Sequence, residues 1–376
     1  GWNDVGHHGG DIPTPNIDAL GYHGVILSNH YSQSLCSPSR AALLTGKYPI
    51  RLGFQGKPIQ AGSTVGLPLS EKILPQYLRK LGYTNHIVGK WHLGSCEKAM
   101  LPTSRGFDTH FGFWNGYIGH YDGVHAHHSS GMRGLDLHRG SEGAWTESYG
   151  KHITNLLSEE AVAVIRNRTE EEGLFLLVTH AAPHTGNPGL ALMSPPNGLG
   201  DRGAHIRDHK RRMYADMVKA LDDSVGNIVE ALADKDLLKN SIIIFISDNG
   251  APSVDPLWSF DNGGSNWPLR GVKASAHEGG VKTTGVVWSP LLKNPGRIYR
   301  NLFHITDWLP TFYAAAGGNP KYLAGLDGKN HWETLRTGRG DPPRVNLLVE
   351  MDDAGVEAFI MHHWKLVKGN AMLYRT

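Results

Sequence analysis

Short apolar runs alternate with segments of helical periodicity along most of the chain. The apolar runs predict strands at Val25–Leu27, Tyr83–Val88, Leu174–Val178, Ile242–Ile246, Val281–Trp288 and Val345–Val349. The helical patterns lie at about 70–81, 153–166, 210–234 and 306–316. Because helices and buried strands alternate, the chain is expected to form an α/β sandwich around a large, mostly parallel central sheet.

The segment at about 70–81 has the clearest amphipathic pattern. Its apolar positions Ile73, Leu74, Tyr77, Leu78 and Leu81 share one helical face. Ser70 can cap the start of this helix, and Gly82 can end it. With the strand that follows, this helix predicts one βαβ-like unit.

The stretch Ser34–Gly46 predicts another short helix. Pro38 suits the first helical turn, and Gly46 suits the left-handed residue that ends a helix. Cys36 would then lie at the helix N-terminus, where the N–H groups and the dipole favour an anion and make a thiol reactive. A small buried cysteine before an ordinary helix is the other interpretation of these residues.

Polar side chains follow three of the predicted strands at the points where the strands end. They are Lys90 and His92, then His180 and His184, then Asp248 and Asn249. In open α/β sheets, ligands bind beyond the carboxyl ends of the strands, so we expect one polar site at this edge. Taken singly, His184 could be a loop residue and the Asp248–Gly250 stretch a turn.

The composition of the chain excludes some classes of function and leaves others open. The 376 residues include 37 Lys and Arg and 35 Asp and Glu, and this net charge of +2 argues against a nucleic-acid binder driven by bulk charge. The 22 histidines leave room for a titratable site, although the His-rich segment 117–140 lacks clean metal-ligand spacing and is expected to be a polar loop. Cys36 and Cys96 cannot build a disulfide framework, and no apolar run approaches membrane-spanning length.

The two ends of the chain also carry expectations. Gly1–Asp4 contains neither an initiator Met nor a signal peptide, which indicates a mature, trimmed or partial product. The sequon Asn167–Thr169 would be relevant in a secreted or lysosomal protein. Residues 358–374 predict a strand–turn–strand around Lys368–Asn370, so we expect a main domain over 1–345 and the start of a truncated C-terminal subdomain over 346–376.

Six blocks of residues resemble the sulfatase family, and the resemblance covers essentially the whole chain. The signature block is Cys36-Ser37-Pro38-Ser39-Arg40, followed by Leu44-Thr45-Gly46. The others are Gly89–Gly94, Arg105–Asp108, Ser247–Gly250, Asn266–Gly271 and Glu278–Gly280. Within this family, the sequence is most similar to the branch of arylsulfatase B, which is the N-acetylgalactosamine-4-sulfatase, and its invertebrate relatives. This resemblance implies an alkaline-phosphatase-like fold.

The resemblance also implies a chemistry. In the family, the motif cysteine, here Cys36, is oxidised to formylglycine by a formylglycine-generating enzyme in the secretory pathway. One hydroxyl of the hydrated aldehyde attacks sulfur and the ester oxygen leaves; loss of a proton from the other hydroxyl then expels sulfate.

By the same resemblance, the remaining blocks supply cations, an acid, a base and metal ligands. Lys90 and Lys273 would hold sulfate oxygens, Arg40 would steady the diol, His92 would be the base and His184 the acid. Asp248 and Asn249, with the modified Cys36, would bind one Ca²⁺ ion. Two further metal-binding aspartates of the family precede the segment equivalent to Gly1–Asp4, and Asp4 is not expected to be a ligand. On its own, Lys273 could be a surface lysine.

We therefore expect a calcium-dependent sulfatase acting on a sulfated sugar or aryl-type alcohol, located in a lysosome or outside the cell. A phosphate or phosphonate ester hydrolase of the same superfamily and an inactive sulfatase-like binding protein are the alternatives. The segments 117–140 and 185–209 are expected to shape the substrate pocket.

Overall fold

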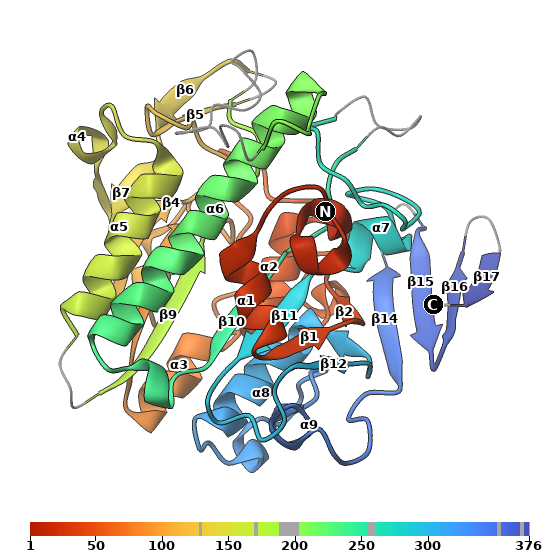
Figure 1. Cartoon of the computed structure of the whole chain (residues 1–376). Helices are drawn as coiled ribbons and strands as arrows, with labels where there is room; N and C mark the ends of the chain where they lie inside the picture. The colour runs from red at the N-terminus through yellow and green to blue at the C-terminus, as the bar shows by residue number, and fades with distance from the viewer. Residues whose placement is uncertain are drawn as a thin grey trace. The chain divides into compact units, whose positions relative to one another are not determined.

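The computed structural model describes residues 1–127, 130–168, 172–187, 203–253, 261–351, 355–368 and 372–375. These residues divide into two compact units. Figure 1 shows the helices and strands of the chain, coloured by residue number. Unit 1 consists of Gly1–Asp11, Ile17–Pro58 and Leu238–Thr376, and unit 2 consists of Ile12–Asn16 and Ile59–Leu237. The expected domain boundary at residue 345 stays a prediction.

The first sheet of unit 1 has four strands. In order across the sheet they are β10 (Ile243–Ile246), β11 (Gly285–Trp288), β1 (Val25–Leu27) and β12 (Arg297–Tyr299). Strand β11 runs antiparallel to both β10 and β1, whereas β12 runs parallel to β1. Apolar side chains from these strands pack with Phe303 and Trp308 in one buried cluster. The short strand β13 (Phe303–His304) pairs in parallel with β2 (His30–Tyr31).

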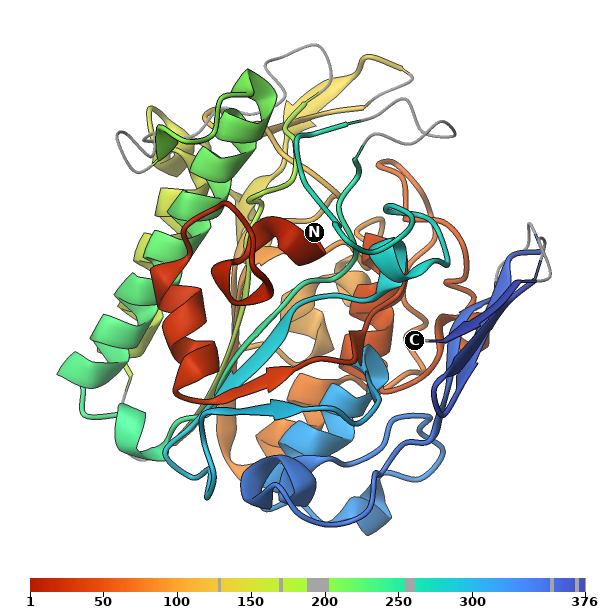
Figure 2. The same ribbon diagram turned by 45° about the vertical axis from the view of Figure 1, so that its right-hand side comes forward.

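A second sheet of unit 1 lies in the C-terminal part of the chain (Figure 2). Its antiparallel strands are β14 (Asn346–Met351), β15 (Glu357–Met361), β16 (Trp364–Val367) and β17 (Met372–Arg375). Residues 358–374 thus hold parts of three strands, not two, because an additional turn at His362 separates β15 from β16. The expected turn residues 369 and 370 lie outside the described residues.

The sheet of unit 2 has five strands. In order they are β8 (Glu142–Gly143), β7 (Leu137–Arg139), β4 (Thr109–Phe113), β3 (Tyr83–Lys90) and β9 (Gly173–Thr179). Strand β3 runs parallel to both β4 and β9, as in a βαβ arrangement. Helix α5 (Ile153–Arg166) packs against these three strands, and the long helix α6 (His209–Asp234) lies beside α5 (Figures 1 and 2).

The predicted α/β class is confirmed, but the sheets are more mixed than expected. In the four-stranded sheet with β1 and the five-stranded sheet with β3, the described pairings comprise three parallel and four antiparallel ones. Strands β7 and β8 form a tight hairpin, which only antiparallel strands allow. Strand β11 enters its sheet between β10 and β1 and runs against both.

Several helix boundaries follow the sequence prediction, and one does not. Helices α2 (Cys36–Thr45), α5, α6 and α8 (Trp308–Ala315) lie where they were expected. The helix predicted at 70–81 instead begins with α3 (Leu74–Leu78) and continues as a 3₁₀ turn to Leu81. Pro75 has no N–H group, so it can stand only in the first turn, and this excludes a start at Ser70. Gly82 ends the turn at φ 81°, as predicted.

The remaining helices are short. They are α1 (Pro15–Tyr22), α4 (Trp145–Ser148), α7 (Glu278–Val281) and α9 (Trp332–Thr337). Helix α7 occupies the beginning of the strand predicted at 281–288, so β11 begins only at Gly285. Within the described ranges, no helix is both long and apolar enough to cross a membrane.

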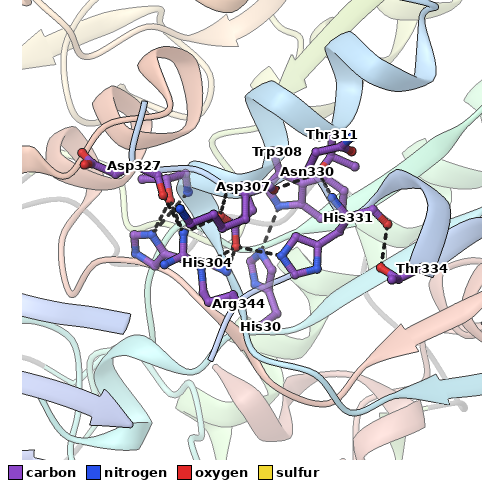
Figure 3. A network of polar contacts seen from close by, with 12 residues as sticks. His30, His304, Asp307, Trp308, Thr311, Asp327, Asn330, His331, Thr334 and Arg344 are labelled. Atoms are coloured by element: carbon purple, nitrogen blue, oxygen red, sulfur yellow. Dashed lines mark hydrogen bonds and ion pairs between the residues drawn. The ribbon is translucent and has the colours of Figure 1, made fainter. Parts of the chain in front are cut away.

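A buried ion pair joins three segments of unit 1 (Figure 3). Arg344 donates from Nη2 to Asp307 Oδ1 at 2.5 Å and from Nε to Asp307 Oδ2 at 2.8 Å. The backbone N–H groups of His304 and Lys329 donate to the same carboxylate. Burial would raise the pKa of Asp307, but the charge and hydrogen bonds of Arg344 hold it well below its usual range. Arg344 also donates to the Tyr48 hydroxyl at 2.9 Å.

We predict that Arg344→Ala lowers the free energy of unfolding by about 3–5 kcal/mol, because Asp307 is left as a buried charge without its partner. Urea denaturation of both proteins measures this difference. Arg336→Ala is the control, since its ion pair with Glu333 lies on the surface. Equal unfolding midpoints for Arg344→Ala and the unsubstituted protein would contradict the prediction.

Candidate functional site

Cys36 is the first residue of the ten-residue helix α2 in unit 1. Leu35 before it is extended, and Gly46 ends the helix at φ 67°, as the sequence predicted. Cys36 is only 4% exposed, so its side chain is buried, as in the second of the two interpretations of these residues. It lies at the helix N-terminus but inside the protein, and no disulfide joins it to Cys96.

Two residues of α2 hold Asp248, which follows β10. Arg40 Nε and Nη2 each lie 3.2 Å from Asp248 Oδ2. The Ser39 hydroxyl donates to the Asp248 carbonyl oxygen and accepts a hydrogen bond from the Gln33 N–H at 3.0 Å. The signature helix and the end of β10 are therefore fixed to each other by side chains of the signature itself.

The loop after Asp248 is braced by segments that belong to two other family-like blocks. Gly250 donates its N–H to the Gly280 carbonyl at 2.8 Å, and a Cβ on Gly250 would lie 1.8 Å from the Gly279 oxygen. The Asn266 side chain accepts from the Ala251 N–H and donates to the Ala251 carbonyl, both at 2.9 Å. The sequence analysis placed these residues in family-like blocks without assigning them a role. The structure shows that they hold the loop after Asp248 in place.

Lys273 is tied through its backbone to both of these parts of unit 1. Its N–H donates to the Ala251 carbonyl at 3.1 Å. The next residue, Ala274, donates to the Ser34 carbonyl at 2.9 Å and has the left-handed φ of 67°. Unit 1 thus brings together the segments that carry Cys36, Arg40, Asp248, Asn249 and Lys273.

Asp248 and Asn249 fit a hard divalent cation. Asn249 Oδ1 is buried and accepts no hydrogen bond from the residues that the structure describes. A carboxylate and an amide oxygen are ligands that Ca²⁺ prefers.

Asp4, which was not expected to be a ligand, is buried, and its carboxylate accepts a hydrogen bond from the Ser265 N–H at 3.0 and 3.2 Å. Among the described His, Cys, Asp and Glu residues, no group of three or more could hold a metal ion.

Unit 2 places the other predicted residues at the carboxyl ends of β3 and β9. These strands are parallel neighbours, with Gly89 opposite Thr179. Lys90 ends β3 and is 4% exposed, and the Thr179 hydroxyl donates to its carbonyl oxygen at 2.8 Å. Two of the three predicted segments thus follow strands of one sheet, whereas Asp248 and Asn249 follow β10 of a different sheet, so the expectation of a single sheet edge holds only in part.

His92 is buried in a backbone conformation that is rare for a residue with a side chain. Its φ is 59°, and its N–H donates to the Trp114 carbonyl at 2.9 Å. Its Nε2 lies 2.8 Å from the Ile59 carbonyl oxygen, which can only accept, so Nε2 carries the proton in the neutral ring. A Cβ on Gly116 would lie 2.8 Å from His92 Cε1, so this glycine makes space for the ring.

His180 and His184 both follow β9, but their surroundings differ. His180 Nε2 lies 3.0 Å from the Ser224 hydroxyl, and burial lowers the pKa of His180 to about 4. His184 donates from Nδ1 to the Thr185 carbonyl at 2.9 Å, and its ring lies parallel to that of Tyr117, with centroids 6.2 Å apart. The lowered pKa keeps His180 neutral near pH 7, so His180 is a poor proton donor there.

The His-rich segment contains an antiparallel hairpin of β5 (Val124–Ala126) and β6 (Arg133–Leu135), so it is not a plain loop. His138 stacks on Trp114 at 3.5 Å between ring centroids. His128, the sequon residue Thr169 and most of 185–209 lie outside the described residues. The proposal that these segments shape a pocket therefore stays a prediction.

Comparison with known proteins gives a consistent result. A family model described as Sulfatase matches residues 1–318. Arylsulfatase J of Mus musculus is 38% identical over 98% of this chain and 62% of its own length. N-acetylgalactosamine-6-sulfatase of Homo sapiens is 34% identical over 90% of this chain and 64% of its own length. The chain thus spans less than two thirds of the length of these relatives.

Solved structures agree with the sequence relatives. The crystal structure of Ps i-CgsB in complex with k-i-k-neocarrahexaose has a TM-score of 0.82 at 30% identity and covers 100% of this chain and 83% of its own. The PsFucS1 sulfatase from Pseudoalteromonas sp. has a TM-score of 0.79 at 26% identity and covers 100% of this chain and 79% of its own. The alkaline-phosphatase-like fold expected from the sequence is confirmed.

We predict that His180 makes the protein less stable in acid. Its folded pKa of about 4 lies below the unfolded value of 6.5, so between these values the unfolded chain binds more protons and stability falls as pH falls. His180→Gln should reduce the stability lost between pH 7 and pH 5 by about 1–2 kcal/mol.

Urea unfolding at several pH values measures this slope, with the exposed His205→Gln as control. An unchanged slope in His180→Gln would show that this histidine does not cause the acid sensitivity.

Proposed function

Because this chain belongs to the sulfatase family, we propose that it hydrolyses sulfate monoesters. The observation that carries the proposal is the family signature at the start of α2, whose Arg40 is paired with Asp248 in unit 1. A sulfated sugar or an aryl sulfate is the proposed substrate. The similar proteins include arylsulfatase J, N-acetylgalactosamine-6-sulfatase and a protein solved with a neocarrahexaose.

The nucleophile is proposed to derive from Cys36. A formylglycine at this position, once hydrated, supplies a hydroxyl for attack on sulfur and a second hydroxyl for release of sulfate. The helix N-terminus favours negative charge at this position, and Arg40 follows one turn later on the same helical face. The ion pair with Asp248 holds the guanidinium in place, so Arg40 can steady an anionic oxygen without reorienting.

The histidines are proposed to move the protons. His184 would protonate the leaving ester oxygen from Nε2, because Nδ1 donates to the Thr185 carbonyl. His92 would accept a proton at Nδ1, because the Ile59 carbonyl keeps the proton of the neutral ring on Nε2. Lys90 and Lys273 would hold the sulfate oxygens by charge.

Asp248 and Asn249 are proposed to hold one Ca²⁺ ion together with the modified side chain at position 36. A bound calcium ion would supply positive charge that stabilises the anionic sulfate group. The buried Asn249 Oδ1 supports this assignment, because the described surroundings offer it no donor. The proposed location is the secretory pathway, lysosomal or extracellular, with a formylglycine-generating enzyme as the maturation partner.

Turnover of 4-nitrophenyl sulfate and 4-nitrophenyl phosphate by the full-length protein from its native source tests this function. We expect the sulfate to be the better substrate, a formylglycine mass in the peptide containing residue 36, and loss of turnover in Cys36→Ala. Cys96→Ala is the matched control, since Cys96 is exposed and far from α2 in sequence. Preference for phosphate would favour the ester hydrolase alternative, and no turnover of either ester would favour the inactive binding protein.

We predict that Gly116→Ala slows sulfate ester turnover by about 10–100-fold, because the added Cβ pushes the His92 ring out of position. Gly116 has no left-handed φ, so the effect is steric and not a backbone effect. Gly134→Ala is the control, since a Cβ there meets nothing within 4 Å. The measurement is kcat for 4-nitrophenyl sulfate; equal kcat values in the two variants would argue against a role for His92.

A further inference from the structure

Asn187 fixes the far end of the segment that carries His184. It is 2% exposed, and its side chain bonds twice to the backbone of β5 in the same unit. Oδ1 accepts from the Ala126 N–H at 2.8 Å, and Nδ2 donates to the Val124 carbonyl at 2.9 Å. The amide therefore pairs with β5 as the backbone of a neighbouring strand would, although the segment is not a strand.

The peptide groups of His184 are fixed as well. Its N–H donates to the Ala181 carbonyl at 2.8 Å, and its carbonyl accepts from His120 Nε2 at 3.2 Å. His120 is 6% exposed, and its own carbonyl accepts from the Ile153 N–H at the start of α5. With Asn187 only three residues further on, the backbone around His184 is anchored on both sides.

The same strand also holds Tyr117, the aromatic residue whose ring lies parallel to the His184 ring. Tyr117, whose ring is parallel to His184 within 6°, donates its hydroxyl to the Ala126 carbonyl at 2.8 Å. Ala126 thus holds Asn187 through its N–H and Tyr117 through its carbonyl. One residue of β5 therefore holds both the segment that carries His184 and the tyrosine ring that lies parallel to His184.

We propose that Asn187 is a positioning residue for His184, setting its ring so that Nε2 reaches the leaving oxygen of the ester. The inference rests on the proposed function, in which His184 is the acid. Asn187 uses both amide atoms on β5 and is buried, so its influence on the reaction passes through the backbone that it shares with His184.

A comparison of leaving groups tests this role. Phenolate is a strong base and needs protonation as it leaves, whereas 4-nitrophenolate needs it much less. We expect His184→Ala to slow phenyl sulfate by ~10²-fold or more and 4-nitrophenyl sulfate far less. Asn187→Ala should show the same selectivity, with about tenfold slower phenyl sulfate turnover.

Two further variants make the test independent of folding losses. Asn187→Asp keeps an acceptor for the Ala126 N–H but loses the donor to Val124, so we expect a selective loss even if Asn187→Ala unfolds. The double variant Asn187→Ala/His184→Ala should be no slower with phenyl sulfate than His184→Ala alone. Asn294→Ala, which removes a side-chain bond to the Thr337 carbonyl on the surface, is the matched control.

The outcomes separate this inference from the proposed function. Equal slowing of both esters by the Asn187 variants, or additive losses in the double variant, would overturn the positioning role while sulfatase activity stands. Absence of leaving-group selectivity in His184→Ala would remove the acid role and the inference with it. No turnover of either sulfate ester by the folded, unsubstituted protein would overturn the proposed function itself.

Discussion

The buried pair of Asp307 and Arg344 is the constraint on which much of unit 1 depends. A charge buried without a partner is costly, so each of the two residues requires the other to stay in place. Asp307 precedes α8, and Arg344 lies just before β14 and donates to Tyr48, which follows α2. The ion pair, which Figure 3 shows, and the hydrogen bond to Tyr48 therefore join three separate segments of the sequence.

The same network reaches the signature helix through Gln33. The side-chain nitrogen of Gln33 lies 3.1 Å from His304 Nε2 and donates to the Val349 carbonyl, also at 3.1 Å. The Gln33 N–H donates to Ser39 Oγ, which in turn donates to the Asp248 carbonyl. The position of Cys36 is thus set by buried polar bonds on either side of it as well as by apolar packing, and polar bonds are more directional.

Sequence patterns predicted what depends on neighbouring residues. Pro38 and Gly46 bounded α2 correctly, because both act through their own backbone conformation. The helix start at Ser70 was wrong because Pro75 outweighed the apolar periodicity. The importance of Gly116 and Asn187 could not be predicted, since the side chain or strand that each contacts is more than 20 residues away in the sequence. Single glycines and asparagines carry no periodicity, so only the folded chain shows what they contact.

Two left-handed backbones occur at or beside residues that are proposed to act on the ester. His92 has a φ of 59° and Ala274, next to Lys273, has a φ of 67°. Such conformations cost about 1–3 kcal/mol each and persist only where surrounding bonds enforce them. Here the bonds are those from the His92 N–H to the Trp114 carbonyl and from the Ala274 N–H to the Ser34 carbonyl. Folding thus supplies the energy that orients these residues, and an ester that binds need not reorganise them.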